Sequence, residues 1–437
     1  MKKVSDNKPC KKIEQIKIYI WGKYVGAAAF DSVNAYYAFA YDKNFGKSGI
    51  ELSPIHMPLR DNEEPYIFSD LPDATYKRLP ALLADALPDD FGNALIDSYM
   101  ASKGILKSKI TALDRLGYMG SRSMGALEFK PARGPTARRP SAIEMNELVT
   151  EARKAVQGSL KNSTSARGAL RSIIDVGTSA GGARAKAVIA WNPKTKKIYS
   201  GQFDAPKGFE HWLLKFDGMG ADRELGSSQD YGRIEYAYYL MARAAGIQIS
   251  HSRLLEENNR AHFMTKRFDR EKGNIKHHTQ TLCAINHIDY KKKSANSYEQ
   301  FFMTIQQLSL GHDAHVEGFR RMVFNIMGRN CDDHSKNFSF LLKQGGSWEL
   351  APAYDITFAH NPEGEWTKQH LMSVNNKFKN FKIQDFQEIA DRFNVGEAKH
   401  IIEEVRIAIR KWPEFAKMAG LRKQETERIK KLHLLFQ

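Results

Sequence analysis

The sequence predicts an α+β fold, in which an N-terminal α/β module precedes a strand-rich lobe and a mainly helical C-terminal lobe. Apolar residues alternate with period two near the N-terminus, a Pro/Gly/Arg-rich stretch interrupts the chain at 133–140, and helical periodicity dominates from about Tyr298. The 437 residues also exceed the size at which a single core keeps growing. We therefore expect three units, covering residues 13–132, 141–275 and 276–437.

The first unit should open with a β-hairpin. Residues 16–21 alternate between apolar and polar side chains, and Gly22 with Lys23 is the predicted two-residue turn into the next strand. The spacing of leucine and alanine over 79–87 predicts a short helix. The unit is expected to close near 126–129, just before the Pro/Gly/Arg linker.

The second unit should combine a glycine-rich loop with strands and a long helix. A capping-box spacing at Ser141 predicts a helix to about residue 156, ahead of the glycine-rich loop at 177–186. A further helix is expected from about Asp230 to the stop residue Gly246. Between the loop and this helix we expect three strands, over 187–191, 198–203 and 211–216.

Helical patterns prevail in the third unit. We expect one interruption, a hairpin over 338–352 whose turn lies around Gly345 and Gly346. The tail from Gln384 onward is almost wholly helical in pattern, and neither an internal repeat nor a low-complexity block is evident.

Composition restricts the class of protein. Lys and Arg number 66 against 50 acids, a net charge of +16, which favours contact with nucleic acid, nucleotide phosphates or an acidic partner. The alternative is that the surplus only maintains solubility. Three scattered cysteines do not make a disulfide framework, and no run is long and apolar enough for a membrane span or signal peptide. We therefore expect a cytoplasmic protein with no membrane contact.

The residue types that carry phosphate chemistry gather between Asn330 and Asp355. Asp332 precedes Asn337 by five residues, and Asp355 follows the predicted hairpin. In protein kinases a catalytic Asp precedes a metal-binding Asn by the same spacing, and a later Asp completes the magnesium site. An alternative is that the acids only occupy a solvated turn and a helix cap.

A second hypothesis is that the protein is a metal-dependent hydrolase or nuclease. Asp332, Asp333 and His334 are of types that bind metals, and His312 with His315 is spaced for one helix face. A zinc site would need a tighter set of His, Cys and acidic ligands, so these histidines are better explained as surface or capping residues.

The second unit offers matching phosphate-binding groups in the order found in a kinase small lobe. Glycines at 177, 181 and 182 would let backbone amides approach phosphate oxygens. Alternation over 211–216 turns Lys215 away from the apolar face, and Glu235 follows in the next helix. Such a Lys–Glu pair holds the nucleotide phosphates in kinases. The alternative is a surface lysine and a solvated glutamate.

The strand that ends near residue 266 should reach the crossing between the two lobes. Phe268 is a candidate to pack against adenine, and Asp269 is a candidate to order the site. Alternatively, Phe268 belongs to the core and Asp269 forms a surface pair with Arg267.

Taken together, these features resemble the HipA family of bacterial toxin serine/threonine kinases, over almost the whole chain. This implies a protein-kinase-like two-lobed fold with an additional N-terminal α/β module. The resemblance rests on the end of the N-terminal module, the phosphate loop, the hinge, the catalytic loop and the metal-binding strip. In this sequence they read LDRLG with MGAL at 113–127, SAGGARAK at 179–186, KRFDR at 266–270, DDHSKNFS at 332–339 and LAPAYD at 350–355.

The resemblance implies roles for individual residues. Asp332 matches the catalytic base, Asn337 and Asp355 the magnesium ligands, Lys215 the phosphate-binding lysine, and Ser179 the autophosphorylated loop serine. Further nucleotide contacts are expected from the motifs, namely Gly181, Gly182, Ala183, Lys186, Glu235, Phe268, Asp269, His334 and Lys336. Two departures stand out, since Lys266 replaces the glutamate common at the hinge and Asp333 replaces the usual glycine.

We therefore expect an ATP- and Mg²⁺-dependent protein serine/threonine kinase that acts as the toxin of a toxin–antitoxin module. The resemblance also implies a helix-turn-helix antitoxin as partner, operator DNA bound through that complex, and a protein substrate that could be an aminoacyl-tRNA synthetase. The alternative function is a corepressor scaffold on DNA that retains the kinase shape and does not need catalysis.

Overall fold

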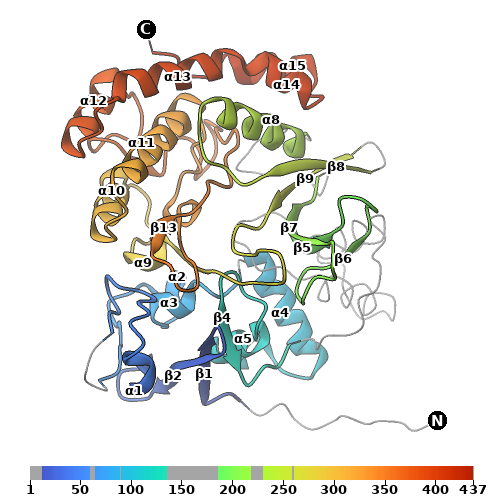
Figure 1. Ribbon diagram of the computed structural model, residues 1–437, viewed down its shortest axis with the longest axis vertical. Coiled ribbons are helices and arrows are strands. Elements are labelled where there is room, and N and C mark those ends of the chain that lie inside the picture. The colour runs from blue at the N-terminus through green and yellow to red at the C-terminus, as the bar shows by residue number, and fades with distance from the viewer. Residues whose placement is uncertain are drawn as a thin grey trace.

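The computed structural model describes residues 12–59, 64–88, 90–134, 186–217, 230–257 and 260–436. It confirms the α+β class, with the N-terminal module at one end of the molecule, the C-terminal helices at the other and the strand-rich lobe to one side (Figure 1). The helix expected at 141–156 and most of the glycine-rich loop, including Ser179, Gly181, Gly182 and Ala183, lie outside the described residues.

The N-terminal module is built on an antiparallel sheet in the order β3-β2-β1-β4. Its strands are β1 (Gln15–Ile20), β2 (Lys23–Asp31), β3 (Tyr36–Tyr41) and β4 (Leu127–Lys130). The predicted hairpin is present, but its turn is Trp21-Gly22, one residue earlier than expected, because Ile20 pairs with Lys23. Both turn residues have positive φ, and the Trp21 indole donates to the carbonyl of Lys276, 2.7 Å away. That distant contact stabilises a bulky residue where glycine is usually found.

Helices complete this module, and some of them pack against the C-terminal lobe. They are α1 (Lys43–Gly46), α2 (Asp73–Tyr76), α3 (Ala81–Ala84), α4 (Asp90–Ser102), the 3₁₀ turn η1 (Lys107–Lys109) and α5 (Ala112–Met119). The short helix predicted at 79–87 is α3. The hydrophobic core of the module includes Cys283, Ala284 and Leu342 from the C-terminal lobe. The two units therefore share apolar packing.

The strand-rich lobe is an antiparallel sheet in the order β6-β5-β7-β9-β8, with one helix packed against it. Its elements are β5 (Lys186–Trp191), β6 (Ile198–Ser200), β7 (Glu210–Lys215), α8 (Tyr231–Ala244), β8 (Ser252–Glu257) and β9 (Arg260–Lys266). All three predicted strands are present, although β6 ends at Ser200 rather than 203. Gly201 lies so close to the Ile189 backbone that a side chain would not fit there.

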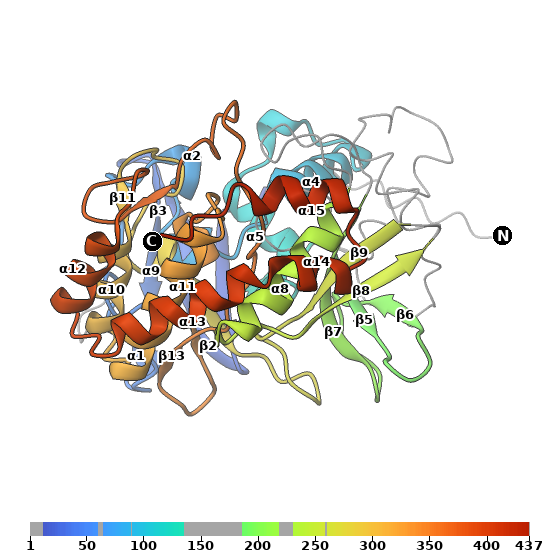
Figure 2. The ribbon, with the colours of Figure 1, turned by 90° about the horizontal axis from the view of Figure 1, so that it is seen from above.

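The C-terminal lobe is mainly helical, and its core also takes in α8. Its helices are α9 (Leu282–Ile285), α10 (Tyr298–Gln307), α11 (His312–Met327), η2 (Ser335–Asn337), α12 (Ile383–Arg392), α13 (Ala398–Arg410), α14 (Trp412–Met418) and α15 (Lys423–Lys430). In Figures 1 and 2, α13 and α14 lie across α11 and α8. The tail thus links the two lobes.

Strands in this lobe shape the loops between the helices. They are β10 (His278–Thr281), β11 (Asn296–Ser297), β12 (Ser339–Leu342), β13 (Trp348–Leu350) and β14 (Met372–Ser373). The hairpin β12–β13 confirms the one expected at 338–352, and β10 extends it to a sheet in the order β10-β12-β13. The parallel pair β11–β14 had no sequence signal.

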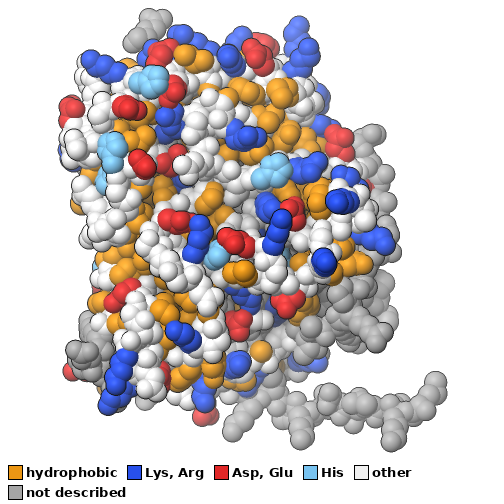
Figure 3. All heavy atoms as spheres, viewed as in Figure 1, with side chains coloured by type: hydrophobic (Ala, Val, Ile, Leu, Met, Phe, Trp, Pro, Cys, Tyr) orange, Lys and Arg blue, Asp and Glu red, His pale blue; other side chains and the backbone are white. Residues whose placement is uncertain are grey.

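The surface drawn in Figure 3 carries basic side chains scattered among acidic ones rather than gathered in one patch. Among the described residues, no helix is both long and apolar enough to cross a membrane. Cys283 and Cys331 are buried free thiols.

Candidate active site

Lys215 connects the strand-rich lobe to the strip between Asn330 and Asp355. It lies at the end of β7, 8% exposed, and its Nζ donates to Glu235 Oε1 at 2.6 Å and to the carboxylate of Asp355. Burial alone would lower the pKa of Lys215, but Asp355 and Glu235 outweigh it and hold the pKa above its usual value. At neutral pH a charged ammonium group therefore lies between two acids from different lobes.

Glu235 reaches Lys215 because α8 lies unusually close to β9. Gly232 precedes Glu235 by three residues, and a Cβ at Gly232 would lie 2.0 Å from the carbonyl oxygen of Ala261 in β9. Glycine is thus needed for the close approach of helix and strand. Lys215 pairs with Phe263 in the same sheet, so this contact sets the distance between Glu235 and Lys215.

Replacing Gly232 with Ala should push α8 away from β9. We expect the free energy of unfolding to fall by about 1–3 kcal/mol, as measured by urea denaturation. The matched control is Gly396→Ala, because no atom lies within 4 Å of a Cβ built at that exposed glycine. Equal stability of the two variants would contradict the close-contact role of Gly232.

Asp355 and Asn337 face the same recess. Its lining also includes Asp333, Phe338 and Tyr354. Asp355 has φ +57°, a left-handed conformation that is uncommon for a residue other than glycine and often marks a functional site. Burial would raise the pKa of Asp355, but Lys215 and Lys186 lower it to about 2. At neutral pH this side chain is a carboxylate.

Hydrogen bonds hold the loop from Asp332 to Asn337 closed. The Asn337 side-chain amide donates to the backbone carbonyl of Asp332 at 2.7 Å, joining the two ends of the loop. Ser335 Oγ donates to the carbonyl of Ile288 at 2.7 Å, and the Tyr354 hydroxyl donates to that of Lys336 at 2.6 Å. Neither Ser335 nor Tyr354 was a predicted site residue, although Tyr354 directly precedes Asp355.

Asp332 is the accessible acid of this loop, with 43% of its side chain exposed. The partial burial of its carboxylate raises the pKa, and although His334 and Lys215 act in the opposite direction, Asp355 and Asp333 help to bring the pKa to about 6. A carboxylate with a pKa close to neutrality is well suited to accept a proton. Asp332 is therefore an accessible carboxylate whose pKa is raised.

The oxygen atoms of Asn337 and Asp355 in the recess are suitable ligands for a hard divalent cation such as Mg²⁺. The Nδ2 of Asn337 is engaged by Asp332, which leaves the amide oxygen as the coordinating atom, and Asp355 supplies a carboxylate. Oxygen donors of these two types, completed by water and phosphate oxygens, are the usual surroundings of Mg²⁺. The residues present thus suit the predicted metal.

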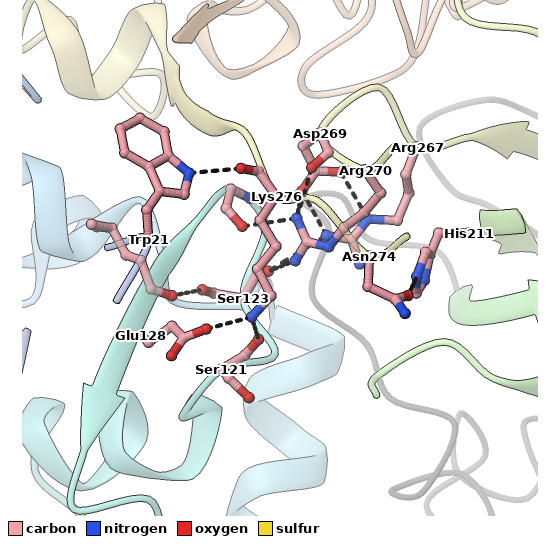
Figure 4. Close-up of polar contacts among 12 residues, drawn as sticks. Trp21, Ser121, Ser123, Glu128, His211, Arg267, Asp269, Arg270, Asn274 and Lys276 are labelled. Atoms are coloured by element: carbon pink, nitrogen blue, oxygen red, sulfur yellow. Dashed lines mark hydrogen bonds and ion pairs between the residues drawn. The ribbon is translucent and has the colours of Figure 1, made fainter. Parts of the chain in front are cut away.

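Asp269, a predicted nucleotide contact, lies in a buried network of ion pairs. Its carboxylate is fully buried and accepts from Arg267 at 2.6 and 2.9 Å, from Arg270 at 2.7 Å and from the backbone N–H of Gly125 at 2.8 Å (Figure 4). Arg270 in turn donates to the carbonyls of Gly125 and Ser123. Asp269 therefore connects the segment between the lobes to the N-terminal module.

Other predicted nucleotide contacts lie around the recess. The Phe268 ring packs against the Tyr354 ring, with centroids 5.6 Å apart. Lys336 Nζ lies 5.1 Å from the centre of the Tyr290 ring, and His334 Nε2 lies 3.7 Å from Asp332 Oδ1. Lys266, which stands where the family commonly has glutamate, forms an ion pair with Glu210 on β7, 2.7 Å away.

The acids Asp332 and Asp333 do not act as one ligand set. Asp333 is fully buried and turned into the helical lobe, whereas Asp332 is accessible. His315 lies in the first turn of α11, where its Nδ1 is 2.9 Å from the Gly311 carbonyl. Within the part of the chain that the structure describes, no group of three or more His, Cys, Asp or Glu is placed to hold a metal. This geometry does not favour the hypothesis of a metal-dependent hydrolase.

Two family models match this chain, one in its N-terminal module and one across the two lobes. Residues 16–130 match the HipA N-terminal domain, and residues 178–412, more than half of the chain, match the HipA-like C-terminal domain. The chain belongs to the HipA family. The resemblance suggested by the five motifs is thereby confirmed.

Two relatives place this HipA family member among known proteins. A Haemophilus influenzae protein named "Putative kinase" is 31% identical over 135 residues, which cover 28% of this chain and 39% of that protein. The match thus spans less than half of that relative. The solved complex of HipA, HipB and operator DNA from the Shewanella oneidensis toxin–antitoxin system contains a similar chain, with a TM-score of 0.65 and 16% identity over 95% of both chains. These two chains share a fold.

Proposed function

We propose that this HipA family member is an ATP- and Mg²⁺-dependent protein serine/threonine kinase that acts as the toxin of a toxin–antitoxin module. The observation that carries the proposal is the position of Lys215, which contacts Glu235 from its own lobe and Asp355 from the other. This is the arrangement by which a lysine orients nucleotide phosphates while an adjacent acid binds the metal.

Each group has a defined task in the proposed reaction. Asp332 accepts the proton of the attacking serine or threonine hydroxyl, and Lys215 orients the phosphates of ATP. Asn337 and Asp355 would hold Mg²⁺, which when bound offsets the negative charge of the phosphates. Transfer moves the γ-phosphoryl group to the hydroxyl oxygen and leaves ADP. Lys186, buried at the start of β5, adds positive charge near Asp355.

Purified protein incubated with γ-labelled ATP and Mg²⁺ tests this proposal. We expect label on the protein itself or on proteins of a bacterial lysate, on serine or threonine, and loss of labelling with EDTA. Folded protein that labels neither itself nor the lysate would overturn the enzymatic assignment.

The rate of transfer should depend on pH through Asp332. Its pKa of about 6 means that the carboxylate is ionised at pH 7.5 and protonated at pH 5. Because only the ionised form accepts a proton, kcat/KM should fall as the pH drops through about 6. A profile that stays flat to pH 5, in protein shown by circular dichroism to be folded, would exclude Asp332 as the base.

We further propose that Ser179 is autophosphorylated and that this silences the enzyme. A phosphate adds about two negative charges to the glycine-rich loop, next to bound ATP. Peptide mass spectrometry of protein expressed in active form should find phosphate on Ser179 and none in the Asp332→Asn variant. An unmodified Ser179 with phosphate on another residue would contradict this proposal.

The proposed partners follow from the family and the fold. The Shewanella HipA was solved with HipB and operator DNA. We propose that this chain likewise binds a helix-turn-helix antitoxin, and DNA through it, in the cytoplasm, and that its protein substrate could be an aminoacyl-tRNA synthetase. The net charge of +16 supports contact with a polyanion.

A further inference from the structure

A buried carboxylate directly follows the proposed base and takes no part in the proposed reaction. Asp333 is 0% exposed and accepts three hydrogen bonds of 2.8 Å each. The Tyr298 hydroxyl and His370 Nδ1 donate to Oδ2, and the backbone N–H of Leu371 donates to Oδ1. A buried carboxylate with this many donors is firmly fixed in place.

The donors are positioned by the strand pair β11–β14. Asn296 pairs with Met372 and Ser297 with Ser373. Tyr298 directly follows β11, and Leu371 directly precedes β14, so the pairing brings both donors to the same point. The capping box of Ser297 and Gln300 also fixes the start of α10, where Tyr298 lies. Asp333 is therefore held to two separate segments of the lobe.

A second chain of hydrogen bonds continues from Tyr298 to the other side of Asp332. Asn325 Nδ2 donates to the Tyr298 hydroxyl at 3.1 Å, and Asn330 Nδ2 donates to Asn325 Oδ1 at 3.0 Å. These side chains are all 3% exposed or less. Asn330 and Asp333 thus anchor the chain on either side of Asp332. Among residues 330–333, Asp332 alone has a side chain that is accessible to solvent.

Charge strengthens the contact between Asp333 and His370. Burial would lower the pKa of His370, but Cys331 and Asp333 outweigh it and raise the pKa to about 10. His370 is then an imidazolium at neutral pH, and the two side chains form a buried ion pair.

We propose that Asp333 is a positioning residue for the phosphotransfer reaction, which fixes through Tyr298, His370 and Leu371 the direction in which Asp332 meets the target hydroxyl. This inference rests on the proposed kinase function. Asp333 is fully buried, and we expect it to act through the backbone that it shares with Asp332. A misplacement of about 1 Å at a reacting group can lower a rate by roughly 100-fold.

The Asp333→Asn variant tests this role, because it keeps the size of the side chain and removes its charge. We expect kcat per folded molecule to fall by about 10- to 100-fold, with KM for ATP unchanged. The control is Asp313→Asn, an exposed aspartate in the first turn of α11, which should leave kcat unchanged. An unchanged kcat in Asp333→Asn, or parallel losses of kcat and ATP affinity, would overturn the inference.

A double-mutant cycle separates a specific contact from general damage. If Asp333 and His370 act as a pair, the double variant Asp333→Asn/His370→Asn should be no slower than the slower single variant. Independent, additive losses would contradict the pair. If Asp333→Asn does not fold, Tyr298→Phe removes one donor and keeps the ion pair, and its kcat should fall by a smaller factor with KM for ATP unchanged. An unchanged kcat in Tyr298→Phe would then overturn the inference.

Hydrogen exchange tests the anchor without any activity. Amides over 331–337 should exchange faster in Asp333→Asn than in the wild type, while those of α13 should not change. If wild-type protein transfers no phosphate but shows this difference, the proposed function fails and the anchoring role of Asp333 stands. Unchanged exchange over 331–337 would contradict the claim that Asp333 anchors this loop.

Discussion

Asp332→Asn should lower the rate of phosphate transfer by about 100- to 10,000-fold, the usual contribution of a general base. Asn keeps the size of the side chain but cannot accept the proton from the target hydroxyl. Lys215, Asn337 and Asp355 are untouched by the change, so the affinity for ATP with Mg²⁺ should stay close to that of the wild type. Rates with labelled ATP and affinities from calorimetry measure the two effects separately.

The same position distinguishes the kinase from the corepressor scaffold in cells. Under the kinase proposal, Asp332→Ala should abolish the effect of the protein on growth at equal expression. Full activity of Asp332→Ala in cells would favour the scaffold, in which catalysis is dispensable.

Asp269→Asn should cause the largest loss of stability. The change would leave Arg267 and Arg270, which are 4% and 8% exposed, without the carboxylate that balances them. Removing one partner from a buried ion pair typically costs about 3–5 kcal/mol. Urea denaturation should show this loss in the free energy of unfolding.

An exposed ion pair supplies the control for Asp269. Asp73 pairs with Arg78 at 2.7 Å, and both side chains are nearly half exposed. Asp73→Asn should therefore cost less than about 1 kcal/mol. If Asp269→Asn proved as mild as Asp73→Asn, the network in Figure 4 would not be what holds the N-terminal module to the crossing between the lobes.

The order of residue types along the chain predicted much of the fold. Alternation over 211–216 indicated that Lys215 points away from the apolar face, and in the structure Trp212, Leu214 and Phe216 belong to the core of the lobe while Lys215 contacts Glu235. Local periodicity is enough for this conclusion, because the side-chain direction in a strand depends only on position. The hairpin β12–β13 was likewise marked by local glycines.

The features that the sequence did not predict involve partners far away along the chain. The hairpin turn lies one residue earlier than predicted, and the Trp21 indole in this turn donates to the carbonyl of Lys276, 255 positions later. Asp269 accepts a hydrogen bond from the backbone of Gly125, which lies 144 positions earlier. No pattern near either residue could reveal these contacts. The contacts of Asp333 were hidden for the same reason, since Tyr298 and Leu371, which flank β11 and β14, meet it through the pairing of these strands.

A structure of the protein with Mg²⁺ and a non-hydrolysable ATP analogue tests the central claim most directly. The account predicts the metal on Asn337 and Asp355, Lys215 on the phosphates, and Asp332 facing the γ-phosphate with space for a hydroxyl between them. A nucleotide bound outside the recess, or a metal that does not contact Asn337 and Asp355, would contradict it.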